Sequence, residues 1–131
     1  MSSILLVDDD EDIILFLREM LEDDGHRVET SLTGREALEK ARSSQFGIIL
    51  LDYILPDMSG DEVVDELKRM NCRAAVYFLT GHRLTKEEIE RSGVVQGVLA
   101  KPVTYEALMA VVNVPPDAST VSNEHPTVVL E

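Results

Sequence analysis

The sequence predicts an α/β fold, a doubly wound five-stranded parallel sheet with helices on both of its faces. Short strand-like runs alternate with helical patterns from residue 3 to about residue 113. The run at 47–51 is continuously apolar, which is typical of a strand buried on both faces. Parallel neighbours need helical crossovers, so five such β–α units indicate a parallel sheet between two layers of helices.

Each element has its own pattern in the sequence. The expected strands lie at 4–7, 26–31, 47–51, 74–79 and 95–99. Apolar residues at helical spacing predict the helices, with stripes at Ile13, Ile14, Leu17, Met20 and Leu21, at Ala37, Leu38 and Ala41, at Val63, Val64, Leu67 and Met70, and at Ala107, Leu108, Val111 and Val112. Capping-box patterns begin three helices, at Thr33 with Glu36, Ser59 with Glu62, and Thr85 with Glu88. The helix after Thr85 is expected to be short and polar.

Composition and charge restrict the classes of protein to consider. The 131 residues suffice for one ordinary domain and not for two, and with 44% hydrophobic residues they can fill its core. The formal net charge of -13 argues against a nucleic-acid surface and against docking on anionic membranes. A basic protein partner or a bound cation would fit that charge better.

The location of the protein is predicted from what the sequence lacks. Cys72 is the single cysteine, so no intrachain disulfide can form and a reducing compartment is expected. The first residues show neither the basic region nor the long apolar stretch of a secretory signal. No apolar run approaches the roughly 20 residues that cross a bilayer. We therefore expect a cytoplasmic protein.

The composition changes after Asn113, where Pro115 and Pro116 precede Ser, Thr, Asn and another Pro. Such a segment has no core of its own and is typical of a linker or tail. We therefore divide the chain into a domain at 1–113 and a tail or truncated linker at 114–131. The apolar residues at 128–130 could pair with an exposed sheet edge, but a loose end is the favoured interpretation.

Polar side chains follow four of the predicted strands. In an open parallel sheet, ligands bind beyond the carboxyl ends of the strands. The polar residues expected at that edge are Asp8, Asp9, Asp10, Asp52, Thr80 and Lys101. Carboxylates that lie close together raise one another's pKa and destabilise the fold unless a cation lies among them. Hard oxygen ligands suit Mg²⁺, which would screen Asp52 from its neighbours.

Lys101 and Thr80 complete a set suited to phosphoryl transfer. The Lys101 ammonium would bind a phosphate oxygen as a point charge, and the Thr80 hydroxyl could hydrogen-bond another. Phosphoryl transfer needs mainly positioning and charge compensation, and this set offers both. That strands simply end in polar residues explains single positions, but it fits the combination poorly.

The same residues lie in four motifs that carry a family resemblance. The motifs are Val7-Asp8-Asp9-Asp10, Asp52 followed by Leu55-Pro56-Asp57-Met58-Ser59-Gly60, Leu79-Thr80-Gly81, and Lys101-Pro102. Together they resemble the receiver domain of two-component response regulators (CheY-like), over about residues 3–113 and in the family's order. The resemblance implies a flavodoxin-like (βα)5 fold with the strand order 2-1-3-4-5.

The resemblance also implies a phosphorelay function. Asp52 would be the phosphoacceptor, Thr80 and Lys101 would contact the phosphoryl group, and the Lys101-Pro102 bond would be cis. The donor would be a phosphohistidine on a sensor histidine kinase or phosphotransfer protein, and the signal would pass to a downstream protein or output domain. Such a chain is a signalling domain and not an enzyme, although it assists its own phosphorylation and slow dephosphorylation.

A magnesium site is implied in the same way. Asp9 and Asp52 would bind Mg²⁺ directly, together with the backbone carbonyl of Ile54. Asp8 would act largely through water. Apolar Ile54 also occupies a position that tunes phosphoryl lifetime in the family. His82 occupies another, although an exposed loop residue is at least as good an interpretation of His82 as a role in gating water. Because the Ile54 side chain cannot orient an attacking water, we expect slow self-hydrolysis.

One position departs clearly from the family pattern. Three residues before Lys101, most relatives carry Tyr or Phe, whose ring moves inward when Thr80 engages the phosphate. This chain has Val98 there, so an aromatic switch coupled to Thr80 cannot operate. We expect an altered readout with phosphoacceptance intact.

Other polar residues receive structural interpretations. His26 and His125 have no acidic or cysteine partner at metal-ligand spacing, and both are interpreted as structural or solvated. Cys72 lies near a helix end without a local base, which argues against a nucleophile. The acidic stretch at 22–24 is expected to be a solvated helix end.

Two other classes share parts of the pattern. Phosphatases of the haloacid dehalogenase type also place an Asp nucleophile after the first strand, and Asp8 and Asp10 fit their spacing. Asp12, however, stands where Thr or Val is usual, and a cap domain is lacking. A flavin-binding module needs a Ser-, Thr- and Gly-rich loop after the first strand, where acidic residues would repel the phosphate.

Overall fold

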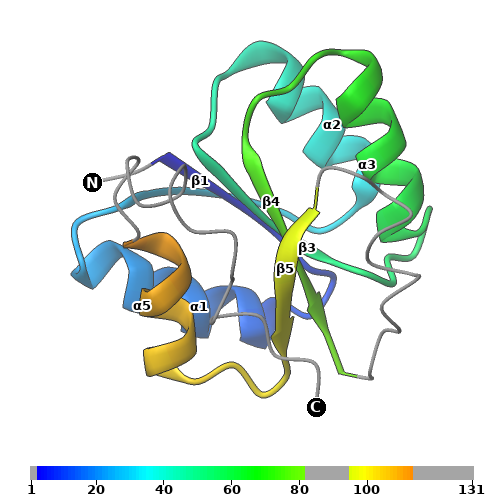
Figure 1. Ribbon diagram of the computed structural model, residues 1–131. Coiled ribbons are helices and arrows are strands. Elements are labelled where there is room, and N and C mark those ends of the chain that lie inside the picture. The colour runs from blue at the N-terminus through cyan, green and yellow to red at the C-terminus, as the bar shows by residue number, and fades with distance from the viewer. Residues whose placement is uncertain (1–2, 82–94, 114–131) are drawn as a thin grey trace.

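The computed structural model describes residues 3–81 and 95–113, which form one sheet of parallel strands between two layers of helices (Figure 1). The strands are β1 (Ser3–Val7), β2 (Arg27–Ser31), β3 (Ile48–Asp52), β4 (Ala75–Thr80) and β5 (Val95–Ala100). The described helices are α1 (Glu11–Asp23), α2 (Gly34–Ser43), α3 (Gly60–Arg69) and α5 (Tyr105–Val112). The strand order β2-β1-β3-β4-β5 and the parallel pairing confirm the predicted fold class.

Some expectations concern parts of the chain that lie outside the described residues. They are the helix after Thr85, His82, His125 and the tail at 114–131. Of the helices at 3–81 and 95–113, none combines the length and apolar composition that crossing a bilayer requires.

The core consists of two apolar layers, one on each face of the sheet. Alternate side chains of a strand point to opposite faces, so Leu5 and Val7 pack beneath α2 and α3 whereas Ile4 and Leu6 pack beneath α1 and α5. All five residues of β3 are buried, as its continuous apolar run predicts. Because both faces are covered, the polar groups at the strand ends are held on a rigid scaffold.

Two of the predicted capping boxes can be compared with the structure. The box that begins α3 is complete, because the hydroxyl and the amide of Ser59 both bond to the residue three positions on. In α2 only half of the box forms. The Glu36 amide donates to Thr33 Oγ1 at 3.1 Å, but the Glu36 carboxylate accepts from the amide of Leu32 instead of Thr33. That carboxylate also faces Lys40 one turn on, which fixes its direction.

The acidic stretch at 22–24 is exposed at the end of α1, as expected, and its last residue also makes side-chain contacts. Asp24 Oδ2 accepts a hydrogen bond of 2.9 Å from Asn113 Nδ2. The buried His26 places Nε2 3.2 Å from Asp24 Oδ2 and 3.1 Å from Asn113 Oδ1. The structural interpretation of His26 agrees with its burial and these contacts, although no local pattern could identify the contact with Asn113, which spans 87 positions. The Asn113 hydrogen bond, followed by His26, outweighs burial and lowers the pKa of Asp24.

The two sides of the loop from β3 to α3 are hydrogen-bonded to each other. Ile54 and Ser59 form an isolated antiparallel bridge, and the Gly60 amide donates to the Tyr53 carbonyl at 2.6 Å. A Cβ on Gly60 would lie 2.9 Å from Phe78 Cε1 and 3.0 Å from Tyr53 Cα. Only glycine therefore fits at this position without displacing backbone or a buried ring.

Replacing Gly60 by Ala is expected to lower the free energy of unfolding by about 1–3 kcal/mol, which is typical of overpacking a buried position. The added methyl would overlap Phe78 and the Tyr53 backbone. Urea unfolding measures the change.

Gly81→Ala is the matched control, because no heavy atom of the described residues lies within 4 Å of a Cβ built there. Its stability should change by no more than about 0.5 kcal/mol. Equal effects of the two substitutions would show that Gly60 is not sterically required.

Candidate functional site

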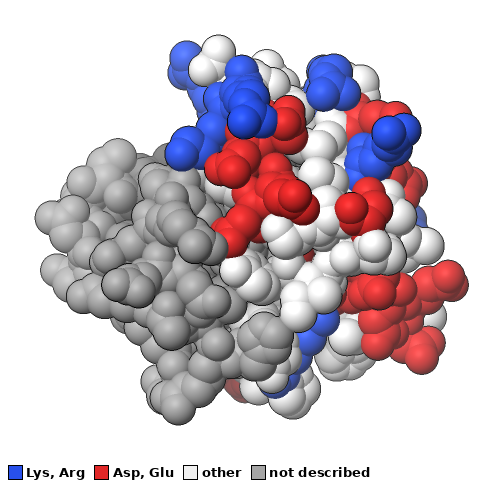
Figure 2. All heavy atoms as spheres, turned by 90° about the vertical axis from the view of Figure 1, so that its right-hand side faces the viewer, with Lys and Arg blue, Asp and Glu red and all other residues white. Residues whose placement is uncertain are grey.

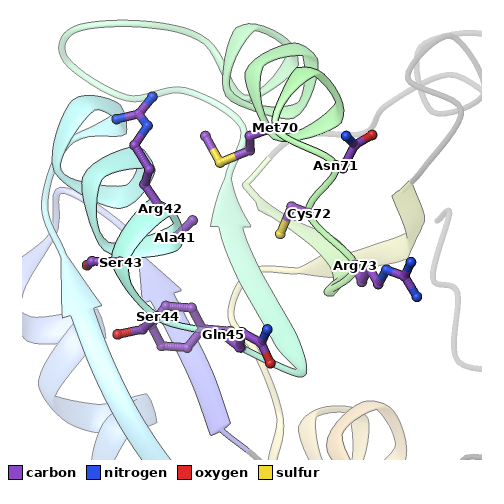
Figure 3. A pocket seen from close by; sticks show the side chains of 10 residues that line it. Ala41, Arg42, Ser43, Ser44, Gln45, Met70, Asn71, Cys72 and Arg73 are labelled. Atoms are coloured by element: carbon purple, nitrogen blue, oxygen red, sulfur yellow. The ribbon is translucent and has the colours of Figure 1, made fainter.

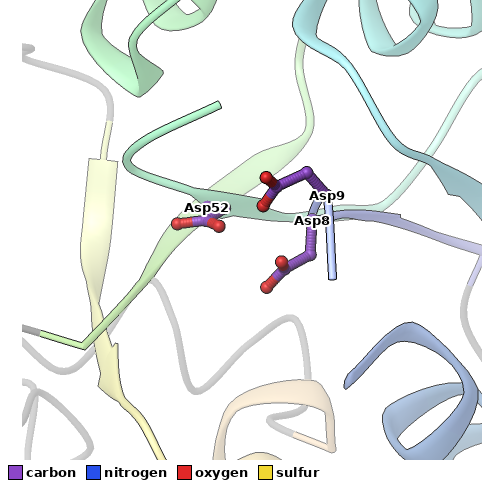
Figure 4. Close-up of side chains that lie close together, drawn as sticks. All are labelled: Asp8, Asp9 and Asp52. Carbon is purple, nitrogen blue, oxygen red and sulfur yellow. The ribbon is translucent and has the colours of Figure 1, made fainter. Parts of the chain in front are cut away.

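Three carboxylates meet at the carboxyl edge of the sheet. Asp8 and Asp9 follow β1, and Asp52 ends β3, which is the parallel neighbour of β1. Each offers an oxygen, and these oxygens lie within 4.8 Å of one another. Figure 4 shows Asp8 and Asp9 extending from the end of β1 beside Asp52. Asp8 is fully buried, Asp52 is 7% exposed and Asp9 is exposed, so the group opens to solvent on one side.

Asp10 belongs to the edge but not to this group of carboxylates. Its Oδ1 accepts hydrogen bonds from the amides of Asp12 at 3.0 Å and Ile13 at 3.3 Å, so it caps the N-terminus of α1. The first amides of a helix have no intrahelical partner, and an Asp at this position satisfies them. The Asp10 amide in turn donates to Asp8 Oδ1 at 2.9 Å, which fixes the Asp8 side chain.

Lys101 supplies positive charge from the other side of the sheet edge. Its Nζ lies 2.8 Å from Asp8 Oδ2 and 3.3 Å from Asp52 Oδ2. Burial alone would lower the pKa of Lys101, but the two carboxylates outweigh it and the pKa is raised. The Lys101 amide bonds to the Thr80 carbonyl at 2.8 Å, and the Lys101-Pro102 peptide bond is cis, as the resemblance implies.

The ionised form of the Asp52 carboxylate is disfavoured by its surroundings. Burial, and then the negative charge of Asp8, raise its pKa to about 6. The Ile54 amide donates to Asp52 Oδ1 at 3.2 Å, and this bond and Lys101 only partly oppose the shift. Among residues 3–81 and 95–113, the groups around Asp52 therefore balance its charge only in part.

The donor set fits a small divalent cation. With all side chains ionised, the three carboxylates and one ammonium that the structure describes here leave an excess of negative charge. The ligands are hard oxygens, which Mg²⁺ prefers, and the exposed side beside Asp9 leaves room for the waters that Mg²⁺ keeps. A cation here would favour the ionised form of Asp52 and lower its pKa.

The other predicted site residues lie at or near the same edge. Thr80 is buried at the end of β4, the strand that separates β3 from β5. Ile54 has a side chain that is 57% exposed, and the metal-binding role of its carbonyl remains a prediction. Val98 is buried, lies in register with Phe78 and belongs to the apolar layer beneath α2 and α3.

One acidic residue near the site has no separate role in the sequence patterns. Asp57, in the loop after β3, accepts hydrogen bonds from the amides of Gly34 at 2.8 Å and Arg35 at 2.9 Å. The partners lie more than 20 positions earlier in the chain, so no local pattern could identify them. The contact joins the loop after Asp52 to the N-terminus of α2.

The opposite edge of the sheet contains a hollow of about 560 Å³ between the ends of α2 and α3. Figure 3 shows Arg42 and Arg73 at two sides of it, with Met70 and Cys72 between them. None of the predicted site residues lines this hollow.

Positive charge gathers at the same end of the helical layer. The last turns of α2 and α3 carry Lys40, Arg42, Lys68 and Arg69. Figure 2 shows Lys and Arg along the upper rim of the molecule, where Figure 1 places these helix ends. Cations stabilise the C-terminal ends of helices, where the helix dipole is negative. A structural role therefore explains the positive charge along this rim.

Comparison with known proteins decides the family. The model of the response regulator receiver domain matches residues 4–113. The chain belongs to this family. Within the receiver domain, the motifs at Asp8-Asp9, Asp52, Thr80 and Lys101 all fall inside the matched range.

The receiver domain resembles proteins of several kinds. It is 37% identical over 107 residues to a response regulator receiver protein of Anaeromyxobacter, covering 80% of this chain and 44% of that protein. It is 32% identical over 113 residues to the aerobic respiration control sensor protein ArcB of Escherichia coli, covering 84% of this chain and 14% of ArcB. The chain thus spans less than half the length of either curated relative.

A solved structure shows the same fold. The chemotaxis response regulator CheY4 of Vibrio cholerae superimposes on the receiver domain with a TM-score of 0.80 and 32% identity. The match covers 86% of this chain and 97% of that one, so almost the whole of CheY4 has its counterpart here.

Replacing Asp52 by Asn is expected to stabilise the metal-free receiver domain at pH 8. The pKa of Asp52 is about 6 in the folded protein and about 3.9 in an unfolded chain. The folded state therefore binds the proton more tightly, and wild-type stability falls as the pH rises from about 4 to about 6. The shift is worth at most about 3 kcal/mol, and loss of the Lys101 contact leaves a gain of about 1–2 kcal/mol in urea unfolding.

The same comparison at pH 4.5 is the control. Asp52 then carries a proton in the folded protein, so Asp52→Asn removes little charge and should change stability much less. A gain of the same size at both pH values would contradict the electrostatic cause.

Proposed function

We propose that this receiver domain accepts a phosphoryl group on Asp52 from a phosphohistidine and passes the signal on through a change of conformation. The observation that carries the proposal is the meeting of Asp8, Asp9, Asp52 and Lys101 at one edge of the sheet. Its support is the family, whose members act with histidine kinases and output domains. No comparison supports the haloacid dehalogenase alternative.

In the proposed step, an oxygen of the ionised Asp52 carboxylate forms a bond to phosphorus. The P–N bond of the donor histidine breaks, its electron pair stays on the ring nitrogen, and that nitrogen takes up a proton. Lys101, already 3.3 Å from Asp52 Oδ2, favours the ionised carboxylate and would then bind the transferred phosphoryl group. The Thr80 hydroxyl would hydrogen-bond another phosphoryl oxygen.

Mg²⁺ is the metal that we propose for the site. Asp9, Asp52 and the Ile54 carbonyl would bind it directly, and Asp8 would bind it largely through water. When bound, it would supply the positive charge that the three carboxylates and the phosphoryl oxygens require. The raised pKa of Asp52 supports this proposal, because burial and the charge of Asp8 disfavour the ionised carboxylate and a bound cation would favour it.

The readout is proposed to differ from that of receivers with an aromatic switch. Val98 is buried, and its short side chain has no ring that could move between an outer and an inner position. Thr80 must therefore transmit its engagement by another route than the side chain at position 98.

The wider setting of the domain stays a prediction. We propose a receiver domain at 1–113 followed by a tail or linker at 114–131. The partners would be a histidine kinase or phosphotransfer protein and a downstream protein or output domain, without direct contact to nucleic acid or membrane. A cytoplasmic location fits such a role.

Incubation with acetyl phosphate and Mg²⁺ is expected to label Asp52. Peptide mapping after reductive trapping of the acyl phosphate should find the label at this position, and Asp52→Asn should lose more than nine-tenths of it. Without Mg²⁺, labelling should fall strongly because the carboxylates then repel the donor.

Asp10→Asn is the control for lost charge near the site. Asn is as good a helix cap as Asp, so the fold should be kept and labelling should persist. A label on Asp8 instead of Asp52 would overturn the proposed function.

The phosphoryl group on Asp52 is expected to persist for minutes or longer. The exposed Ile54 side chain offers no group that could orient an attacking water. Ile54→Asn should shorten the lifetime of trapped label several-fold, whereas Ile54→Leu should leave it unchanged. Loss of the wild-type label within seconds would refute the role of Ile54.

A further inference from the structure

The loop after β3 is a closed unit that carries part of the proposed site. Ile54 and Ser59 bridge its two sides, and the Gly60 amide bonds back to the Tyr53 carbonyl. The Ile54 amide holds Asp52 Oδ1 at 3.2 Å. A displacement of the loop tip would therefore move Ile54 and, with it, one side of Asp52.

The tip of this loop is fastened to the N-terminus of α2 by one carboxylate. Asp57 Oδ1 accepts from the Gly34 amide at 2.8 Å, and Asp57 Oδ2 accepts from the Arg35 amide at 2.9 Å. These amides lie in the first turn of the helix, where they have no intrahelical partner and where the helix dipole favours negative charge. Burial would raise the pKa of Asp57, but the two amides outweigh it and the pKa is lowered.

A second contact joins the same two segments. A Cβ on Gly34 would lie 2.4 Å from Met58 Cγ and 2.5 Å from Met58 Sδ, so Met58 lies directly against the start of α2. Asp57 and Met58 thus hold the loop from adjacent positions, one by hydrogen bonds and the other by close packing. The loop tip and the first turn of α2 form a single packed unit.

We propose that Asp57 is a positioning residue for metal binding: by anchoring the loop after β3 to α2, it holds the Ile54 carbonyl and Asp52 ready for Mg²⁺. This inference rests on the proposed function. A loop that is ordered beforehand loses less conformational freedom when the metal binds, and the affinity is higher for that reason. Outer contacts that orient metal ligands are typically worth about 10- to 100-fold in affinity.

The coupling must act in both directions. If α2 helps to hold the metal ligands, then a bound metal must help to hold the first turn of α2 by the same factor. The amides of Gly34 and Arg35 should therefore exchange with solvent more slowly when Mg²⁺ is present.

The test measures Mg²⁺ affinity by NMR titration of the unphosphorylated protein, with no phosphoryl donor added. Asp57→Ala should weaken binding by about 10- to 20-fold, at the lower end of the range for such outer contacts. Asp57→Asn keeps one acceptor oxygen and should lie between Asp57→Ala and the wild type. If Asp57→Ala fails to fold, the Mg²⁺ affinity of Asp57→Asn is compared with that of the wild type instead.

Thr33→Ala is the matched control. Thr33 caps the same helix by accepting from the Glu36 amide at 3.1 Å, but it does not bond to the loop. It should lower the stability of α2 and leave Mg²⁺ affinity within about twofold.

The possible outcomes separate the two proposals. If wild type binds Mg²⁺ and Asp57→Ala binds it equally well, the positioning role is wrong and the proposed function stands. If Thr33→Ala and Asp57→Ala weaken binding alike, general loosening of α2 explains the effect and the positioning role is again wrong. If wild type does not bind Mg²⁺, the proposed metal site itself fails.

Discussion

Negative charge held together at the ends of β1 and β3 is the constraint on which the rest of the structure depends. Asp8 and Asp52 are both buried, and two buried carboxylates are costly unless cations or hydrogen bonds offset them. The sheet order makes β1 and β3 neighbours, and Lys101, which follows β5, lies 2.8 Å from Asp8. Burial and the charge of Asp8 raise the pKa of Asp52 to about 6 even with this ammonium nearby. Among the described residues, the site therefore carries more negative charge than Lys101 offsets.

The features that the sequence predicts well are those with a local or periodic cause. Apolar runs located all five strands, and the convergence of strand ends brought Asp52 and Lys101 to one edge because parallel strands share their direction. Hydrogen bonds between distant segments were missed. Asp24 with Asn113, and Asp57 with Gly34, join residues whose proximity exists only after the layers have packed. The half-formed box at Thr33 failed for a different, local reason, because the Glu36 carboxylate could reach the neighbouring Leu32 amide instead.

The paired side chains of β4 and β5 differ in size, and the larger one, Phe78, packs toward the loop after β3. Phe78 and Val98 lie in register, with the large ring on β4 and the small side chain on β5. The Phe78 ring meets Tyr53 edge-on, with 5.1 Å between ring centroids, and Gly60 allows it close approach. Tyr53 also donates to Asp61 Oδ2 at 2.9 Å, so the residue next to Asp52 is tied to the first turn of α3. This packing joins β4 and the end of β3 to the helical layer of α2 and α3.

The group of Asp24, His26 and Asn113 has a mechanical consequence. His26 Nε2 faces two oxygen acceptors, so it must carry a hydrogen, and Asp24 receives hydrogens from both of its partners. Asn113, the C-cap residue of α5, is thereby hydrogen-bonded to the turn between α1 and β2. The end of α5 is therefore held against the start of β2 by side chains from two distant parts of the chain.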